Sequence, residues 1–285
     1  MSCKKNIKYV MVNIDKLIRQ GAHYGQFSNI GHPQTRKFLY GSTSVRNNQV
    51  IDLVQTGLSL QKARNLIHQV SIARGTILLV ATEDPMSTIL SRLGDKYPIH
   101  YVNTKWIGGM LTNWKTLSQA IRKFHTLDFL SKNGQLETLS SQDIVKLKKQ
   151  KSRLEKYLGG IKYLTGLPWL VVVLGPGDKR GVISECEKLD IPTIGVLDTY
   201  CNPSDFTIYV PCSAEAPQSH SWIVIQIIEA IVSNLKRFPS ASSNKPPRLS
   251  SRSPRLLSPS KYLNNPSRLQ DLIDDLNRST QAGGF

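Results

Sequence analysis

Short apolar runs that alternate with segments of helical periodicity constrain the fold more than any other feature of this chain. The runs are residues 76–80, 97–102, 169–174 and 193–197. Runs of this kind are expected of strands buried on both faces of a sheet. Apolar residues at helical spacing follow two of the runs, in residues 84–93 and 180–189. The sequence therefore predicts an α/β fold, with a parallel sheet that is covered by helices on both faces.

Other segments extend this α/β pattern towards both ends. Helices are predicted over residues 12–20 and 58–71, and a long helix is predicted to open at Ser221 and Trp222. Residues 48–53 alternate and are interpreted as the end of a strand. After residue 238 the composition shifts to Pro, Ser and basic residues, which predicts a disordered basic tail over 238–285 with a short amphipathic helix near 267–278.

The net charge indicates the partners of such a fold, and the cysteines indicate its redox compartment. Lys and Arg number 37 against 20 Asp and Glu, which gives a net charge of +17 and an isoelectric point near 9.8. A field of this sign attracts polyanions, either nucleic acid or an anionic membrane surface. No apolar run approaches the roughly 18 residues of a spanning helix, so we expect no membrane partner. Cys3, Cys186, Cys201 and Cys212 lack metal-site or redox spacing, which favours a reduced compartment.

Two amphipathic segments after residue 114 predict an antiparallel helical hairpin. The apolar stripe of the first is Leu117, Ile121, Phe124, Leu127 and Leu130, and that of the second is Ile144, Leu147, Leu154, Leu158 and Ile161. Lys151 occupies the slot between Leu147 and Leu154. The outward faces carry Arg122, Lys123, Lys146, Lys148, Lys149, Arg153 and Lys156. Because burying so many charges within the protein is costly, this surface either stands in solvent or lies on phosphates.

Two loops are further candidates for contacts. In residues 106–114 the pair Gly108 and Gly109 stands between Trp106 and Trp114, which indicates a packed corner between sheet and helix, or a close approach to another molecule. Near the N-terminus, residues 21–25 are interpreted as a loop and residues 33–40 as an extended stretch. Basic residues close to aromatic residues in these segments suit binding to RNA, although a charged loop is more often simply solvated.

No constellation of residues points to catalysis. Gly175, Gly177 and Gly181 follow a strand, but Arg180 stands where the third glycine of a dinucleotide-binding motif belongs. The histidines form no metal or acid/base arrangement. Asp198 and Asp205 flank a loop at the end of a strand, where a metal ion is one interpretation and a loop closed by backbone hydrogen bonds is the favoured one. We therefore predict no catalytic residue, no cofactor, no resident metal and no small-molecule substrate.

Several motifs resemble those of the ribosomal protein S2 family of the small ribosomal subunit. They are Gly21 with His23, Tyr24 and Gly25; residues 106–113; residues 158–162 with 166–168; Ile191 with Pro192; and Asp198 and Thr199 with Cys201 and Pro203. The resemblance implies a Rossmann-like (flavodoxin-like) parallel sheet with an inserted antiparallel coiled-coil hairpin. It also implies a structural, non-catalytic component with small-subunit rRNA and neighbouring ribosomal proteins as partners. It places the family domain at residues 10–237, with the hairpin inserted at about 114–162.

The resemblance also assigns roles to individual residues. The residues expected to contact rRNA are His23, Tyr24, Arg36, Lys37, Thr112, Asn113, Lys115, Arg122, Lys123, Lys146, Lys148, Lys149, Arg153, Lys156 and Lys162. Those expected to build structural loops are Trp106, Gly108, Gly109, Trp114, Gly159, Gly160 and Asp198.

Departures from the family pattern favour an organellar protein. Gln26 replaces a usual histidine, and Thr82, Glu83, Asp84 and Pro85 replace a commonly basic loop. With the high charge and no recognisable leader, this favours a mitochondrion, and a chloroplast is the alternative. Two other functions stay open: a nucleotide-binding α/β enzyme acting on RNA through residues 175–178, and an RNA-binding regulator outside the ribosome.

Overall fold

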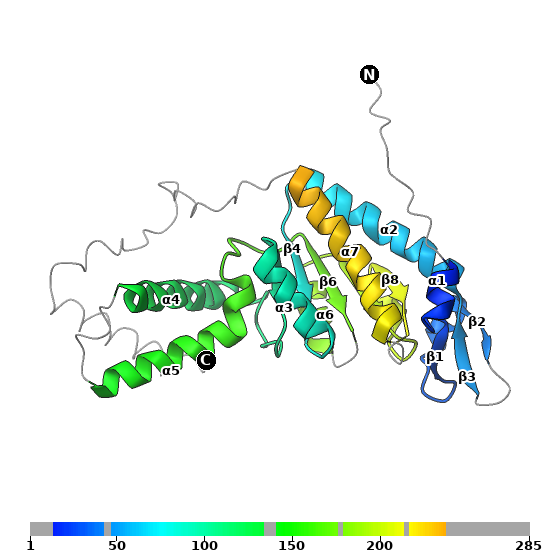
Figure 1. The fold of residues 1–285 in the computed structure, drawn as a ribbon, viewed down its shortest axis with the longest axis horizontal. Helices are drawn as coiled ribbons and strands as arrows, with labels where there is room; N and C mark the ends of the chain where they lie inside the picture. Colours follow the sequence, from blue (N-terminus) through cyan, green and yellow to red (C-terminus); the bar gives the residue numbers. More distant parts are fainter. Residues whose placement is uncertain (1–13, 43–46, 134–140, 176–178, 214–216, 238–285) are drawn as a thin grey trace, which may run out of the picture. The chain divides into compact units, whose positions relative to one another are not determined.

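The computed structural model describes residues 14–42, 47–133, 141–175, 179–213 and 217–237 (Figure 1). The chain divides into two compact units, one of residues 1–117 with 156–241 and the other of residues 118–155 with 242–285. The predicted basic tail and its short helix lie outside the described residues. Within the described residues, no helix is both long enough and apolar enough to cross a membrane.

A parallel five-stranded sheet forms the centre of the first unit. Its strands, in spatial order, are β5 (His100–Val102), β4 (Ile77–Val80), β6 (Leu170–Leu174), β7 (Thr193–Leu197) and β8 (Ile208–Pro211). This order corresponds to the flavodoxin-like arrangement of doubly wound sheets. The predicted parallel sheet is confirmed, and β8 is a strand that the sequence analysis missed. Trp169 was expected inside a buried strand, but β6 begins one residue later and Trp169 is exposed.

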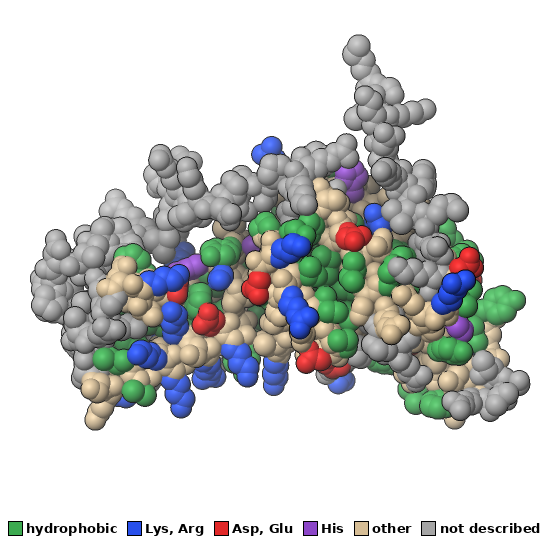
Figure 2. Space-filling view, viewed as in Figure 1, with side chains coloured by type: hydrophobic (Ala, Val, Ile, Leu, Met, Phe, Trp, Pro, Cys, Tyr) green, Lys and Arg blue, Asp and Glu red, His purple; other side chains and the backbone are tan. Residues whose placement is uncertain are grey.

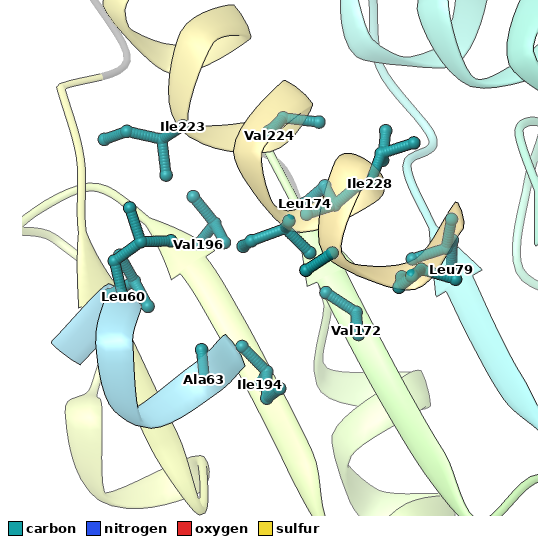
Figure 3. Close-up of a cluster of buried hydrophobic side chains, with 14 of the residues drawn as sticks. Leu60, Ala63, Leu79, Val172, Leu174, Ile194, Val196, Ile223, Val224 and Ile228 are labelled. Atoms are coloured by element: carbon teal, nitrogen blue, oxygen red, sulfur yellow. The ribbon is translucent and has the colours of Figure 1, made fainter. Parts of the chain in front are cut away.

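Every residue of β6 and β7 is buried, so both faces of the sheet are covered. On one face, the side chains of α2 (Leu53–Ile72), α3 (Met86–Lys96) and α7 (Pro217–Arg237) pack on the strands in one cluster. Figure 3 shows Leu60 of α2 and Ile223 of α7 near Val196. Apolar burial of this extent is the main stabilising contribution to such a fold.

The helices begin and end close to their predicted positions, with identifiable exceptions. α2 begins at Leu53 instead of residue 58, because the Asp52 carboxylate accepts a hydrogen bond from Val54 N and caps the helix. α7 begins at Pro217, before the predicted Ser221. α6 (Arg180–Lys188) follows its prediction closely. Short 3₁₀ turns, η3 (Gly159–Ile161) and η4 (Pro203–Asp205), complete this part of the unit.

A small antiparallel sheet lies near the N-terminus, and of its strands only β3 (Asn48–Ile51) was predicted, from the alternation of residues 48–53. β3 lies between β1 (Tyr24–Phe27) and β2 (Leu39–Ser42). Strand β1 includes part of the predicted loop 21–25, and the predicted extended stretch 33–40 is the 3₁₀ helix η1 (Pro33–Phe38) followed by β2. Helix α1 (Ile14–Arg19) precedes this sheet and buries Leu17, whereas Ile14 and Ile18 are exposed.

Both segments of the predicted hairpin are long helices, α4 (Trp114–Lys132) and α5 (Ser141–Leu158). Figure 1 shows them side by side. The turn that joins them includes residues 134–140, which lie outside the described residues. In the second unit the apolar stripe of α4 buries Ile121, Phe124, Leu127 and Leu130. Its counterpart on α5 buries Leu147 fully, which fits the predicted seam between the helices.

Candidate nucleic-acid interface

One side of α5 is a row of exposed cations. Lys146, Lys149 and Arg153 are exposed and, at about 100° per residue, share one side of the helix, about 100–160° around its axis from the buried Leu147. Exposed Lys156 continues the same spacing. No described carboxylate pairs with the first three residues, and Figure 2 shows Lys and Arg side chains gathered along this helix, at the lower left. We call Lys146, Lys149, Arg153 and Lys156 the α5 basic face.

The remaining predicted hairpin cations are placed less uniformly. Lys148 is exposed but lies on the same side of α5 as Glu155, seven residues further on, which weakens the local positive field. On α4, Lys115 and Arg122 are exposed. Lys123 is only half-buried on the side of α4 that carries Leu127 and Leu130, and burial lowers its pKa. The prediction that Lys123 faces outwards is therefore only partly fulfilled.

An ion pair joins the two helices within their seam. Lys151 Nζ lies 2.9 Å from Asp128 Oδ1, and Lys132 Nζ lies 2.7 Å from Asp128 Oδ2. The hydrogen bond from Lys132 and the smaller contribution of Lys151 hold the pKa of Asp128 below its ordinary value, against a smaller opposing effect of burial. Lys151 thus occupies the slot between Leu147 and Leu154 as part of the helix contact, and it is not available to a partner.

A single buried carboxylate organises the loop of residues 106–113. Glu185 of α6, which is 7% exposed, accepts hydrogen bonds from Trp106 Nε1 at 3.0 Å and from the backbone N of Gly109 at 2.8 Å. It also accepts hydrogen bonds from Leu111 N, Thr112 N and Thr112 Oγ1. Burial acts to raise the pKa of Glu185, but the hydrogen bonds from Thr112 N, Leu111 N, Trp106 Nε1 and Gly109 N together outweigh it and hold the pKa below its ordinary value.

The sequence analysis passed over Glu185. The available signal was an acidic residue three positions after the buried Val182, on the inward side of a predicted helix. With Glu185 included, the loop is a polar turn around a carboxylate as well as the packed apolar corner that was predicted. Gly109 has φ +85°, which favours glycine, whereas a side chain at Gly108 would meet open space.

Two predicted RNA contacts in this loop are engaged inside the protein. The Thr112 hydroxyl donates to Glu185, and Asn113 Oδ1 accepts a hydrogen bond from Thr116 Oγ1 at 2.8 Å. Asn113 O accepts from Leu117 N, so the residue also closes the first turn of α4. Trp114 is half-buried at the start of that helix. These contacts favour a positioning role, in which the loop fixes where α4 begins.

The predicted N-terminal contacts lie on the small sheet and its 3₁₀ helix. Arg36 and Lys37 are exposed in the last turn of η1, and Lys37 Nζ lies 5.2 Å from the centre of the Phe38 ring. Tyr24 is exposed at the start of β1. His23 is half-buried, with its Nδ1 buried and without a hydrogen-bond partner among the described residues. Of this group, Arg36, Lys37 and Tyr24 are therefore the more accessible to a partner.

The segment after α5 is held tightly against the large sheet. A Cβ on Gly160 would lie 2.2 Å from the carbonyl oxygen of Tyr101, so only glycine fits there, whereas Gly159 faces open space. Lys162 is half-buried, and its Nζ lies 5.2 Å from the centre of the Tyr163 ring. Gly160 thus has a clear structural role, while Gly159 has no such constraint in the structure.

The contacts of Asp198 support its interpretation as a structural residue. Its buried carboxylate accepts hydrogen bonds from Thr199 N at 2.6 Å and Gln26 Nε2 at 3.4 Å, and its carbonyl accepts one from the Tyr209 hydroxyl at 2.7 Å. Asp205 accepts a hydrogen bond from Asn202. The described residues contain no group of three or more His, Cys, Asp or Glu that could hold a metal ion.

The loop considered for nucleotide binding falls largely on residues 176–178, outside the described residues. At its edges, Gly175 has φ +80°, and the buried Lys179 donates a hydrogen bond to Thr82 Oγ1 at 2.9 Å. The Lys179 ammonium therefore lies between the ends of β4 and β6. A buried lysine bound to a neighbouring hydroxyl is a contact of the fold itself.

Comparison with known proteins matches most of the chain to a single protein family. Residues 17–234 match the family model described as ribosomal protein S2. The chain is 34% identical over 227 residues to the small ribosomal subunit protein uS2c of Oltmannsiellopsis viridis, an alignment that covers 80% of this chain and 94% of that protein. The match extends from α1 to α7 and includes the hairpin and the loop around Glu185.

Proposed function

Because the chain belongs to the ribosomal protein S2 family, and is of organellar type, we propose that it is a structural constituent of an organelle's small ribosomal subunit that binds rRNA there. The family is structural and not enzymatic, and its members work in translation. The single observation that carries RNA binding is the α5 basic face. Its exposed cations turn away from the seam of the hairpin, where the protein's own carboxylates are engaged.

The mechanism is electrostatic and geometric. Lys146, Lys149, Arg153 and Lys156 neutralise phosphates and release counterions, which fixes the position of the protein on folded RNA without reading its sequence. Arg36 and Lys37 provide a second cationic contact near the N-terminus. Lys148, Lys115, Arg122 and Lys162 contribute at the margins of these surfaces, and the α/β unit offers surface to neighbouring ribosomal proteins.

The domain organisation is part of the same proposal. We assign residues 10–237 to the family domain, with an inserted coiled-coil hairpin at about 114–162 and a separate basic tail over 238–285. The Lys151–Asp128 ion pair supports coiled-coil packing, because a charged pair at one level of a seam specifies how two helices align. The tail carries further Lys and Arg residues and is expected to add affinity for RNA.

The organelle in which the protein works is inferred from its uS2c relative. The sequence analysis favoured a mitochondrion and kept a chloroplast as the alternative. The uS2c protein is of the chloroplast type, which supports the alternative, so we propose the chloroplast ribosome as the location. A protein made or retained there would meet the reduced conditions that suit free thiols such as the buried Cys186, whose pKa burial raises to about 12.

Sedimentation of an organelle lysate tests the proposal. The protein, followed with an antibody, should co-migrate with the small subunit at low and at moderate salt. Migration apart from the subunit at both salt concentrations would contradict the ribosomal role and favour an RNA-binding regulator. Saturable nucleotide binding that is lost on Gly177→Val would favour the enzymatic alternative instead.

A further inference from the structure

Two aromatic side chains of the α/β unit are exposed although their backbones are firmly held. Tyr163 is 67% exposed and Trp169 is 58% exposed. Large aromatic side chains contribute most to stability when they are buried, so exposed ones on a fixed backbone suit contacts with a partner. Both lie in the short segment between η3 and β6, and neither is among the RNA contacts proposed above.

Trp169 is held by its backbone and by one side of its indole ring. Its backbone N donates a hydrogen bond to the carbonyl oxygen of Thr76 at 2.8 Å, and Thr76 Oγ1 donates to the carbonyl of Leu167 at 3.3 Å. A Cβ built on Gly75 would lie 2.9 Å from Trp169 Cγ, which shows that the indole rests directly on the backbone of Gly75. One side of the indole is therefore held by the protein, while more than half of the side chain faces outwards.

Tyr163 is fixed by its neighbours in the chain. Ile161 and Leu164 are buried on either side of it, and Leu164 N donates a hydrogen bond to Ile161 O at 2.9 Å. The close approach of Gly160 to Tyr101 ties the same turn to β5. Because this backbone is already ordered, a partner that covers the ring costs little further conformational entropy.

The surroundings of both rings are cationic. Lys162 Nζ lies 5.2 Å from the Tyr163 ring centre, and exposed Arg74 immediately precedes the glycine on which Trp169 rests. Neither of the two segments involved, residues 53–82 and 156–174, contains an Asp or Glu. Aromatic rings next to cations, with no acidic residue in either segment, match a single-stranded nucleic acid better than a protein surface.

We propose that Tyr163 and Trp169 stack on unpaired bases of RNA, with Lys162 and Arg74 contacting the adjacent phosphates. This inference rests on the proposed function, because it requires that the chain binds RNA. It differs from the α5 basic face in chemistry, since stacking needs bases outside a helix whereas cations alone accept the phosphates of a duplex. The segment thus selects a loop, bulge or strand end of the RNA.

The test compares single-stranded and duplex RNA on the full-length chain. We would measure binding of a labelled single strand of about 12 nucleotides, and of the matching duplex, over a series of salt concentrations. Tyr163→Leu and Trp169→Leu should each weaken single-strand binding about 5- to 100-fold without changing the salt slope, and should leave duplex binding unchanged. Tyr163→Phe and Trp169→Phe, which keep a stacking ring, should bind close to the unmodified chain.

Matched variants separate stacking from charge and from general exposure. Lys162→Gln should lower the salt slope on the single strand by about 0.7. Phe27→Leu changes a phenylalanine on β1 that is 47% exposed and is not among the expected RNA contacts, and it should have no effect. Leucine keeps an apolar cover over Gly75. Fluorescence gives an independent readout, since the part of the tryptophan emission that is lost in Trp169→Leu belongs to Trp169 among the four tryptophans of the chain. Single-stranded RNA should protect that part from acrylamide, whereas duplex RNA should not.

Three outcomes would overturn the inference. One is unchanged single-strand binding by both leucine variants with no protection of Trp169. Another is an equal loss on single strand and duplex. The third is normal RNA binding by leucine variants that no longer enter the small subunit, which would assign the rings to a protein partner. In each case the α5 basic face and the ribosomal role would stand, whereas a chain that neither binds RNA nor sediments with the subunit would refute the proposed function itself.

Discussion

The loop around Glu185 and the α5 basic face use charge in opposite ways. In the loop, one buried carboxylate accepts five hydrogen bonds from within the protein. On α5, the cations Lys146, Lys149 and Arg153 are exposed, and no described carboxylate pairs with them. The comparison teaches that the charge of the loop is used by the fold, while the charge of the helix is available to an anionic partner.

Removal of the Glu185 carboxylate should have the largest effect on the fold. Glu185→Ala leaves five hydrogen-bond donors without their acceptor, and we expect the free energy of unfolding to fall by about 4 kcal/mol. Urea unfolding measures this change. Glu187→Gln, which alters an exposed acid on the same helix, is the control and should stay within about 0.5 kcal/mol of the unmodified chain. Similar stabilities for the two variants would contradict the role given to Glu185.

Neutralising the α5 basic face should change RNA binding and leave the fold intact. With Lys146, Lys149 and Arg153 all replaced by Gln, the slope of log affinity against log salt should decrease by about 0.9 for each lost phosphate contact. Filter binding to small-subunit rRNA measures the slope. Lys62→Gln, an exposed lysine of α2, is the control. An unchanged slope for the triple variant would move the RNA contact away from α5.

Lowering the pH should destabilise the loop around Glu185 before it changes the charge of the α5 basic face. The pKa of Glu185 is lowered in the folded protein, so the unfolded chain binds the proton more tightly and stability rises with pH. The contribution is complete well above the ordinary Glu pKa of about 4.3 and is lost as pH falls through the lower folded pKa. Urea midpoints between about pH 6 and pH 3 should fall less steeply in Glu185→Gln. Equal pH dependence in both proteins would show that Glu185 is not the group involved.

A lysine within the seam gives the smallest expected change and sharpens the comparison. Lys151→Met removes a positive charge from α5 but replaces half of a partly buried ion pair with an apolar side chain. We expect stability within about 1 kcal/mol of the unmodified chain, since Asp128 keeps Lys132. The salt slope of RNA binding should not change. A loss of slope equal to that of Lys149→Gln would mean that position on the helix does not decide which lysines bind RNA.

The parts of the fold that follow from local patterns could be predicted from the sequence. Continuous apolar runs predicted the parallel sheet, and heptad-like stripes predicted the two long helices, because burial on both faces or on one stripe leaves a direct mark on the sequence. In the small sheet, β3 was indicated by the alternation of residues 48–53. Strands β1 and β2 were missed because they are short and leave Tyr24, Phe27 and Tyr40 exposed, so they lack the alternation that a half-buried strand shows.

The candidate site was predictable to a different degree in each region. The spacing of Lys146, Lys149 and Arg153 already placed them on one side of a helix. Glu185 could not be assigned to the loop, because it lies 79 residues from Trp106 and only the packing of the sheet brings them together. Trp169 was expected to be buried, since an apolar run does not show whether its first residue is covered.

Cross-linking of rRNA to protein in intact small subunits tests the central comparison most directly. After ultraviolet irradiation, the cross-linked peptides would be identified by mass spectrometry. We predict cross-links from the α5 peptide that contains Lys146, Lys149 and Arg153, and none from residues 106–113. Cross-links confined to the loop, with none on α5, would contradict the assignment of the RNA contact to the basic face and of the loop to the fold.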